Sequence, residues 1–317
     1  MTSTRELGLP TAVPTASIAA DSVEIWEVGP RDGLQAEQTL LDVDTKVELI
    51  RRLAKAGARV IETGSFVRAD RVPQMADSAE VLARVGDLAA SGIRTPVLVP
   101  NVRGYELARA AGADDVAVFL SVTESFSQQN LGASRERMEQ AVTEVVARAQ
   151  ADGVRVRGYL SMVFGDPWEG AVDTADVVRL ATAMREWGIE QLSLGDTIGV
   201  ATPGQVRGVV RALTAEGIPI EAIALHMHDT YGMAVANVYA GLEEGVRVFD
   251  AAAGGVGGCP FARSATGNLA TDDLVWMLEG LGIRTGIDLD ALTDTSIWLT
   301  SALGKTPASR VATALTR

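Results

Sequence analysis

The chain has 317 residues, 47% of them hydrophobic and 22% charged, which is enough to bury a large core and excludes disorder of the whole chain. Its 41 acidic and 28 basic residues give a net charge of -13, so we expect neither nucleic acid nor a membrane surface as a partner. A single cysteine excludes an internal disulfide, and the apolar runs fall short of the roughly 20 residues that span a bilayer, which favours a cytoplasmic protein.

Residues 1–22 are predicted to form a disordered tail, because they are rich in Ala, Thr, Ser and Pro. In this segment Arg5 is balanced by Glu6, whereas a mitochondrial presequence typically carries several arginines and no acidic residue. The composition therefore favours the cytoplasm over import into an organelle.

From residue 23 onward, short β-branched or apolar runs alternate with stretches of helical periodicity, which indicates repeated strand–helix units. We predict eight strands, at 23–28, 59–63, 96–100, 115–120, 154–160, 190–194, 223–228 and 248–252. The helices between them are predicted to end at left-handed glycines, namely Gly57, Gly92, Gly112, Gly153, Gly188, Gly217 and Gly245. Candidate N-cap residues are Asp44, Ser134, Asp173 and Thr271.

Eight right-handed strand–helix crossovers can close into a (β/α)8 barrel, the TIM barrel, of about 250 residues. The span from 23 to about 282 has this length, so we predict an α/β barrel domain at 23–317. Its last part, from about 283, contains an apolar-periodic segment at 289–303 and predicts one or two additional helices outside the barrel. An open doubly wound sheet is the alternative, but the first strand leads into Gly29-Pro-Arg-Asp-Gly33 instead of a Gly-x-Gly-x-x-Gly turn.

The only two histidines of the chain, His226 and His228, lie at the end of the seventh predicted strand. Side chains two residues apart on a strand point the same way, so both imidazoles are expected at the barrel mouth, where this fold carries its catalytic groups. Two neutral imidazoles favour a metal site. The alternative is a pair of partly buried histidines whose hydrogen bonds are satisfied by neighbouring groups.

Asp32, which follows the first strand, is the expected third ligand, and Asn268 can add an amide oxygen. Nitrogen and oxygen ligands together favour Mg2+ or Mn2+ over structural zinc, which prefers sulfur and nitrogen in a closed tetrahedron. The alternative for residues 29–33 is a plain turn, because Pro, Asp and Gly all favour one.

Cys259 lies in a glycine-rich loop, 254–260, without the apolar neighbours of a core cysteine. A thiol on such a loop can reach over a bound substrate and exchange a proton with it. The alternatives are an incidental cysteine and a loop whose backbone amides hold a phosphate, although the Lys-Ser/Thr of a nucleotide-binding loop does not follow.

Six motifs, in order between about residues 23 and 282, resemble the 3-hydroxy-3-methylglutaryl-CoA lyase family. They are Val28-Gly-Pro-Arg-Asp-Gly-Leu-Gln35, Val60-Ile-Glu-Thr-Gly-Ser-Phe-Val67, Ser193-Leu-Gly-Asp-Thr-Ile-Gly199, His226-Met-His-Asp-Thr-Tyr-Gly232, Gly257-Gly-Cys-Pro260 and Gly267-Asn-Leu-Ala-Thr271. The resemblance implies a barrel enzyme that cleaves this acyl-CoA to acetoacetate and acetyl-CoA in leucine degradation or ketone metabolism. It also implies Mg2+ or Mn2+ as cofactor, and we expect a homo-oligomer, a dimer.

Matched position by position, the resemblance implies that the metal is bound by Asp32, His226, His228 and Asn268. It implies a catalytic set of Arg31, Glu62, Asp196, His226 and Cys259, and we expect Arg31, Gln35 and Ser65 to contact the substrate. Arg31 would lie over the thioester oxygen, where enolate charge develops, and Cys259 would exchange a proton with the nascent acetyl-CoA. Either Glu62 or Asp196 would relay the hydroxyl proton.

Two positions depart from the family pattern: Ala36-Glu-Gln38 stands in place of Asn-Glu-Lys, and Gly64 in a usual Thr/Ser position. They leave a related, longer-branched glutaryl-CoA open as the substrate. A condensing acyltransferase of the isopropylmalate or citramalate synthase type is a further alternative, opposed by the Val-Gly-Pro before Arg31 and by the 35 residues from Ile283 onward, too few for a regulatory domain. A barrel that only binds CoA is the third alternative.

Overall fold

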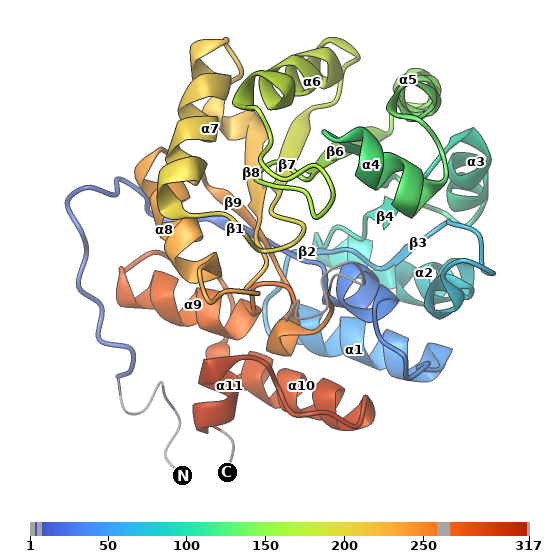
Figure 1. Cartoon of the computed structure of the whole chain (residues 1–317). Coiled ribbons are helices and arrows are strands. Elements are labelled where there is room, and N and C mark those ends of the chain that lie inside the picture. The colour runs from blue at the N-terminus through green and yellow to red at the C-terminus, as the bar shows by residue number, and fades with distance from the viewer. Residues whose placement is uncertain (1–3, 5–7, 259–266, 316–317) are drawn as a thin grey trace.

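The strands of this protein form one curled, parallel sheet. The computed structural model describes residues 4, 8–258 and 267–315, and within them nine strands follow the order β2-β1-β9-β8-β7-β6-β5-β4-β3, with helices around the outside (Figure 1). The strands are β1 (Glu24–Glu27), β2 (Val60–Ile61), β3 (Gly64–Ser65), β4 (Val97–Leu98), β5 (Asp115–Ser121), β6 (Arg155–Ser161), β7 (Gln191–Gly195), β8 (Ile223–His226) and β9 (Val248–Ala251).

β2 and β3, at the two ends of this order, both come from the region of the second predicted strand. β2 pairs with β1, whereas β3 pairs with β4. Between them the Glu62 amide donates to the Glu27 carbonyl at 2.9 Å, and the Thr63 amide donates to the Pro96 carbonyl at 3.0 Å. The Ile61 amide also donates to the Arg94 carbonyl at 3.0 Å, so residues 60–63 bond to both neighbouring strands and join the two ends of the strand order, which closes the sheet. The predicted (β/α)8 barrel is confirmed, with its second strand divided in two.

The helices begin and end close to the predicted positions. Around the barrel lie α1 (Val43–Lys55), α2 (Ser78–Val85), α3 (Val102–Ala110), α4 (Glu124–Phe126), α5 (Arg135–Ala151), α6 (Thr174–Glu186), α7 (Pro203–Ala215), α8 (Ala234–Glu243) and α9 (Thr271–Gly280). All seven glycines predicted to end helices have a positive φ, between 68° and 107°. Ser134 and Asp173 cap α5 and α6 as predicted. The cap of α1 is Asp42 and not Asp44, because the extended Asp42 accepts the Thr45 amide, and Thr271 is the first residue of α9, after the cap residue Ala270.

Two further helices, α10 (Leu289–Ala302) and α11 (Arg310–Leu315), confirm the predicted C-terminal extension. Figure 1 shows them on the outside of the barrel, next to α1 and α9. Asp273 on α9 accepts from the Ser309 hydroxyl and the Val311 amide, so it fixes the start of α11. Among the described helices, none combines the length and the apolar composition of a membrane span.

The described part of the N-terminal segment contacts the outside of the barrel. The Val13 amide donates to the Gly280 carbonyl at the end of α9 at 2.9 Å, and Arg247 donates to the Ala19 carbonyl at 3.0 Å. Figure 1 shows this segment passing α8 and α9 before it enters β1. Disorder of residues 1–22 as a whole stays a prediction.

Candidate active site

The end of β8 places both histidines at the mouth of the barrel, where the strands have their carboxyl ends. His226 is the last residue of β8, and His228 follows two positions later. Their Nε2 atoms lie 3.1 Å apart, and both side chains are buried. Met227 packs into the hydrophobic core instead, as expected from the alternation of side chains along an extended chain.

Asp32 reaches the two histidines from the single helical turn at Gly29–Gly33, which follows β1. Its Oδ2 lies 3.9 Å from His226 Nε2, and one candidate ligand atom from each of the three side chains lies within 4.8 Å of the others. Burial opposes the charge of Asp32, but Arg31 and the histidines lower its pKa to about 2. Burial also lowers the pKa of His228 to about 4, so this imidazole is neutral, as a metal ligand must be.

The donor atoms at this site fit a divalent cation. Asn268 Nδ2 donates to Asp32 Oδ2 at 3.0 Å, while its buried Oδ1 has no hydrogen-bond partner among the described residues. The two facing Nε2 atoms of His226 and His228 also need either a proton or a cation between them. Two imidazole nitrogens, a carboxylate and an amide oxygen form a mixed nitrogen and oxygen set of the kind that divalent cations accept.

Arg31 is a fixed cation beside this site. Its Nε donates to Glu62 Oε2 at 2.8 Å, its Nη2 forms an ion pair with the same oxygen at 2.7 Å, and its Nη1 donates to Asp32 Oδ1 at 2.6 Å. Burial disfavours the charge, yet Glu62 and Asp32 together raise the pKa of Arg31 above its ordinary value. The side chain lines the cavity at the barrel mouth, so its charge faces any bound substrate.

Glu62 is fully buried, and its Oε2 is the oxygen that contacts Arg31. Besides the arginine, its Oε2 accepts from the Tyr159 hydroxyl at 3.1 Å. Tyr159 comes from β6, lines the cavity and was not predicted as a site residue. Its position in the Arg157-Gly-Tyr159 run at a strand end was the available signal, because the two polar residues point into the barrel from alternate positions.

Asp196 follows β7 and organises the loop beside β8. Its Oδ1 accepts from the amides of Val200 and Ala201 at 2.8 and 3.1 Å, and its own amide donates to the His226 carbonyl at 2.9 Å. Burial outweighs these hydrogen bonds and raises the pKa of Asp196 to about 7. A carboxyl group with such a pKa can take up and release a proton at neutral pH.

The other predicted residues lie at different depths. Gln35 is exposed and lines the cavity. Ser65 is 1% exposed and is not among the described residues that line the cavity; its amide donates to the hydroxyl of Ser78 on α2. A Cβ at Gly64 would lie 2.6 Å from that same hydroxyl oxygen, which explains the glycine there. Cys259 lies outside the described residues.

A cavity of about 680 Å3 opens at the barrel mouth beside the candidate metal ligands. One side of it is polar and contains Arg31, Asp32 and the two histidines. Another part of the lining is apolar, because side chains of β4, β5 and β6 meet there in a small cluster. This apolar wall consists of Val67, Leu98, Phe119 and Tyr159, which pack around the buried Ala117. Three exposed arginines also line the cavity: Arg68, Arg71 and Arg137.

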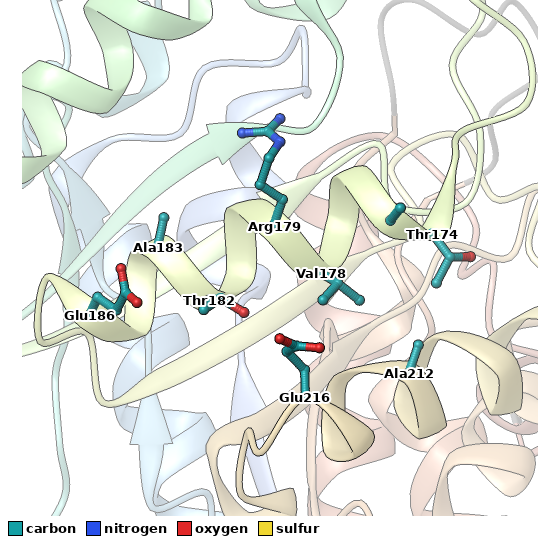
Figure 2. A pocket seen from close by; sticks show the side chains of 9 residues that line it. Thr174, Val178, Arg179, Thr182, Ala183, Glu186, Ala212 and Glu216 are labelled. Carbon is teal, nitrogen blue, oxygen red and sulfur yellow. The ribbon is translucent and has the colours of Figure 1, made fainter.

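A second hollow, of about 630 Å3, lies on the outer surface between α6 and α7 (Figure 2). Short side chains such as Thr182, Ala183 and Ala212 line it, and Glu216 lies at the end of α7 beside it. None of the described candidate site residues contributes to this hollow. The cavity at the barrel mouth is therefore the candidate active site.

Comparison with known proteins places this barrel in a family. The HMGL-like family model matches residues 22–298. The chain is 44% identical to the mitochondrial hydroxymethylglutaryl-CoA lyase of Bos taurus, over 98% of the chain and 96% of the relative. It is 45% identical to a Pseudomonas aeruginosa protein named 3-hydroxy-3-isohexenylglutaryl-CoA/hydroxy-methylglutaryl-CoA lyase, over 92% of the chain and 97% of the relative.

A solved structure agrees with the sequence comparison. An HMG-CoA lyase from Acinetobacter baumannii, in complex with coenzyme A and 3-methylmalate, is similar with a TM-score of 0.88 and 37% identity, covering 96% of this chain and 98% of that chain. The fold and the site thus define a barrel protein with a candidate divalent-cation centre at its mouth. The chain belongs to the HMGL-like family, and the resemblance seen in its six motifs is confirmed.

Proposed function

We propose that this protein is a divalent-metal-dependent carbon-carbon lyase that cleaves 3-hydroxy-3-methylglutaryl-CoA to acetoacetate and acetyl-CoA. The observation that carries the proposal is the convergence of Asp32, His226 and His228 within 4.8 Å, with Arg31 bonded to Asp32. The names of the relatives at 44% and 45% identity support the same reaction.

The reaction breaks the bond between C2 and C3 of the acyl group. The C3 hydroxyl loses its proton and becomes the ketone of acetoacetate, while C2 gains a proton and becomes the methyl group of acetyl-CoA. A bound divalent cation supplies Lewis acidity that makes the hydroxyl easier to deprotonate. The chain must supply a base for that hydroxyl, a positive charge for the thioester enolate and an acid for C2.

We assign the hydroxyl proton to Asp196 in preference to Glu62. A pKa of about 7 suits Asp196 to this transfer, although backbone amides donate to both of its carboxylate oxygens. In Glu62, Oε2 is held by Arg31 and Tyr159, and only Oε1 has no hydrogen-bond partner among the described residues. Glu62 then orients the Arg31 guanidinium. His226 serves as a ligand, together with Asp32, His228 and Asn268.

Arg31 is the proposed partner of the thioester oxygen, where negative charge develops as the bond breaks. Gln35, which lines the cavity, is a proposed substrate contact; Ser65 lies deeper and would act through the strand that carries it. Cys259 is the proposed acid for C2. Its assignment rests on the sequence motif and on Gly258, the residue before it, which lines the cavity.

The identity of the cation and the class of substrate are proposed from the metal ligands and from the residues that line the cavity. Mg2+ or Mn2+ is the proposed cation, because the ligands combine imidazole with oxygen donors. Coenzyme A in the A. baumannii structure supports an acyl-CoA substrate, and the arginines that line the cavity offer charges for an anionic ligand. A role in leucine degradation or ketone metabolism, a cytoplasmic location and a homodimer stay proposals.

A second candidate substrate is a 3-hydroxyglutaryl-CoA with a longer branch at C3. The apolar wall favours it, because a methyl group alone would leave the partly exposed side chains of Val67 and Phe119 in contact with water. The name of the P. aeruginosa relative includes such a branched substrate. The lyase names of the relatives favour cleavage over the condensing acyltransferase considered from the sequence.

The test is acetyl-CoA release by the purified protein from a series of 3-hydroxy-3-alkylglutaryl-CoA thioesters. We expect release from the methyl compound that is abolished by EDTA and restored by Mn2+ or Mg2+. Full activity in EDTA, or release from none of the thioesters at any metal concentration, would overturn the proposal. Relative kcat/KM values along the series decide between the two substrates.

A further inference from the structure

His226 is held on its far side by a buried carboxylate that has no role in the proposed reaction. Asp250 lies on β9, is 1% exposed, and its Oδ2 is 3.2 Å from His226 Nδ1. We propose that Asp250 is a positioning residue, which fixes His226 in the Nδ1–H tautomer and directs the Nε2 lone pair at the cation. This inference rests on the metal site of the proposed function.

The partners of Asp250 keep it an acceptor. Its Oδ1 accepts a hydrogen bond from Arg157 Nη2 at 2.7 Å, and its Oδ2 accepts one from the Ser193 hydroxyl at 2.7 Å. Arg157 is 2% exposed and, with this buried ion pair, holds Asp250 as a carboxylate. A carboxylate has no proton to donate, so a hydrogen bond to His226 requires the proton on Nδ1, and in the neutral ring Nε2 is left with its lone pair.

The carboxylate is also fixed in place. Arg157, Ser193 and Asp250 come from β6, β7 and β9, so three strands of the barrel hold the group. The guanidinium carbon of Arg157 lies 3.8 Å from the ring centroid of Trp26 on β1, which adds a stacking contact. Such buried partners orient the imidazole ring as well as its proton.

The second imidazole lacks this support. His228 Nδ1 is buried and has no hydrogen-bond partner among the described residues. When both rings are neutral and His226 Nε2 is unprotonated, the 3.1 Å contact between the two Nε2 atoms places a proton of the metal-free protein on His228 Nε2. Binding of a cation therefore requires His228 to change tautomer, whereas His226 keeps the one that Asp250 imposes.

Nuclear magnetic resonance of 15N-labelled histidine tests this directly, because the chain has only two histidines. The signals are assigned with His228→Ala. At alkaline pH we expect His226 to carry its proton on Nδ1 both without metal and with Mg2+, and His228 to move its proton from Nε2 to Nδ1 when Mg2+ is added. A wild-type His226 protonated on Nε2 would overturn the proposal without any further variant.

Variants add a second readout, the Kd for Mn2+. For Asp250→Asn we expect 10- to 100-fold weaker binding and a mixture of His226 tautomers. The matched control is Asp115→Asn. Like Asp250, Asp115 lies on a strand, is 1% exposed and forms ion pairs with arginine, but its partners are Arg94 and Arg155 instead of Arg157. The control should leave both readouts unchanged.

The two proposals fail differently. If the wild-type protein does not bind Mn2+, the metal site itself is wrong. If the wild type binds Mn2+ and Asp250→Asn binds it within twofold with an unchanged His226 tautomer, the site stands and the role of Asp250 is wrong. Should Asp250→Asn not fold, Ser193→Ala removes one of the bonds that orient the same oxygen and is expected to weaken Mn2+ binding less, by several-fold.

Discussion

Two nitrogens of Arg31 contact one and the same oxygen of Glu62: Nε donates a hydrogen bond at 2.8 Å, and Nη2 forms an ion pair at 2.7 Å. The contact fixes the plane of the guanidinium while Nη1 is held by Asp32. One buried carboxylate thus sets the direction of the charge that faces the substrate.

Replacement of Arg31 or of Glu62 should distinguish the effect of the arginine's charge from the effect of its orientation. Arg31→Gln removes the charge and is expected to lower kcat by about 10² to 10³-fold or more, the usual effect of losing a group that stabilises the enolate. Glu62→Gln keeps the charge but weakens its orientation, so a smaller loss, about tenfold, is expected. Steady-state acetyl-CoA release measures both; equal losses in the two variants would contradict the separation of roles.

The rate should depend on the protonation of Asp196. Burial raises the pKa of Asp196 to about 7, so the carboxylate that accepts the hydroxyl proton is depleted below this pH. We expect kcat to fall about tenfold for each pH unit below the pKa, and Asp196→Asn to lose about 10² to 10⁴-fold. A wild-type profile that is flat from pH 5 to 8 would assign the proton transfer to another group.

Glu27 should make the fold less stable as the pH rises. Burial raises its pKa from the ordinary 4.5 to about 7, although Thr271, Ala253 and Gly29 donate hydrogen bonds to it. The folded protein then binds a proton that the unfolded chain releases, so this contribution is complete below pH 4.5 and is lost as the pH rises to about 7, by roughly 3 kcal/mol.

Glu27→Gln can keep the two hydrogen bonds from the Gly29 and Ala253 amides at its carbonyl oxygen, its amide nitrogen can donate to the Thr271 hydroxyl, and it has no charge to bury. Its free energy of unfolding in urea should therefore equal that of the wild type at pH 4.5 and exceed it at pH 7. Glu48→Gln, a change on the exposed face of α1, is the control and should follow the wild-type pH dependence. Identical slopes for Glu27→Gln and the wild type would contradict the raised pKa.

The apolar wall should set the limit on branch length. Val67 lines the cavity and packs against the cluster of Leu98 and Phe119. Val67→Phe fills space beside this wall, so kcat/KM for a thioester with a long C3 branch is expected to fall about tenfold or more, while that for the methyl compound changes by less than about threefold. Parallel loss for both substrates would place the branch elsewhere.

The sequence predicted the elements whose signals are local. The seven glycines at helix ends and the single His-x-His of the chain led to the strand count and to His226 and His228, since periodicity along a strand fixes which side chains share a face. To predict that Asp32 and Asn268 lie beside the two histidines, the order of the strands around the barrel was needed as well, and a closed barrel fixes this order.

Other parts of the site depend on contacts between distant strands. Asp250 lies within an apolar strand with no motif around it, and only its burial beside Arg157 and His226 distinguishes it from a structural acid. The division of the second strand at Glu62 and Thr63 was equally hidden, because the run 59–63 has ordinary strand composition throughout. Across it the Glu62 amide donates to Glu27, whereas the Ile61 and Thr63 amides donate to Arg94 and Pro96 on the other side.

The second strand, residues 60–65, is the place where the sheet closes into a barrel, and we call it the seam. β2 pairs with β1 at two positions and with Arg94 at one, β3 pairs with β4 at two positions, and Glu62, which lies between β2 and β3, is hydrogen-bonded to Arg31. Amides at this seam should exchange with solvent faster than those of the seven paired positions between β5 and β6. A ligand that binds at the barrel mouth and immobilises Arg31 would slow this exchange. Ligand binding would therefore stabilise the closure of the barrel through one side chain.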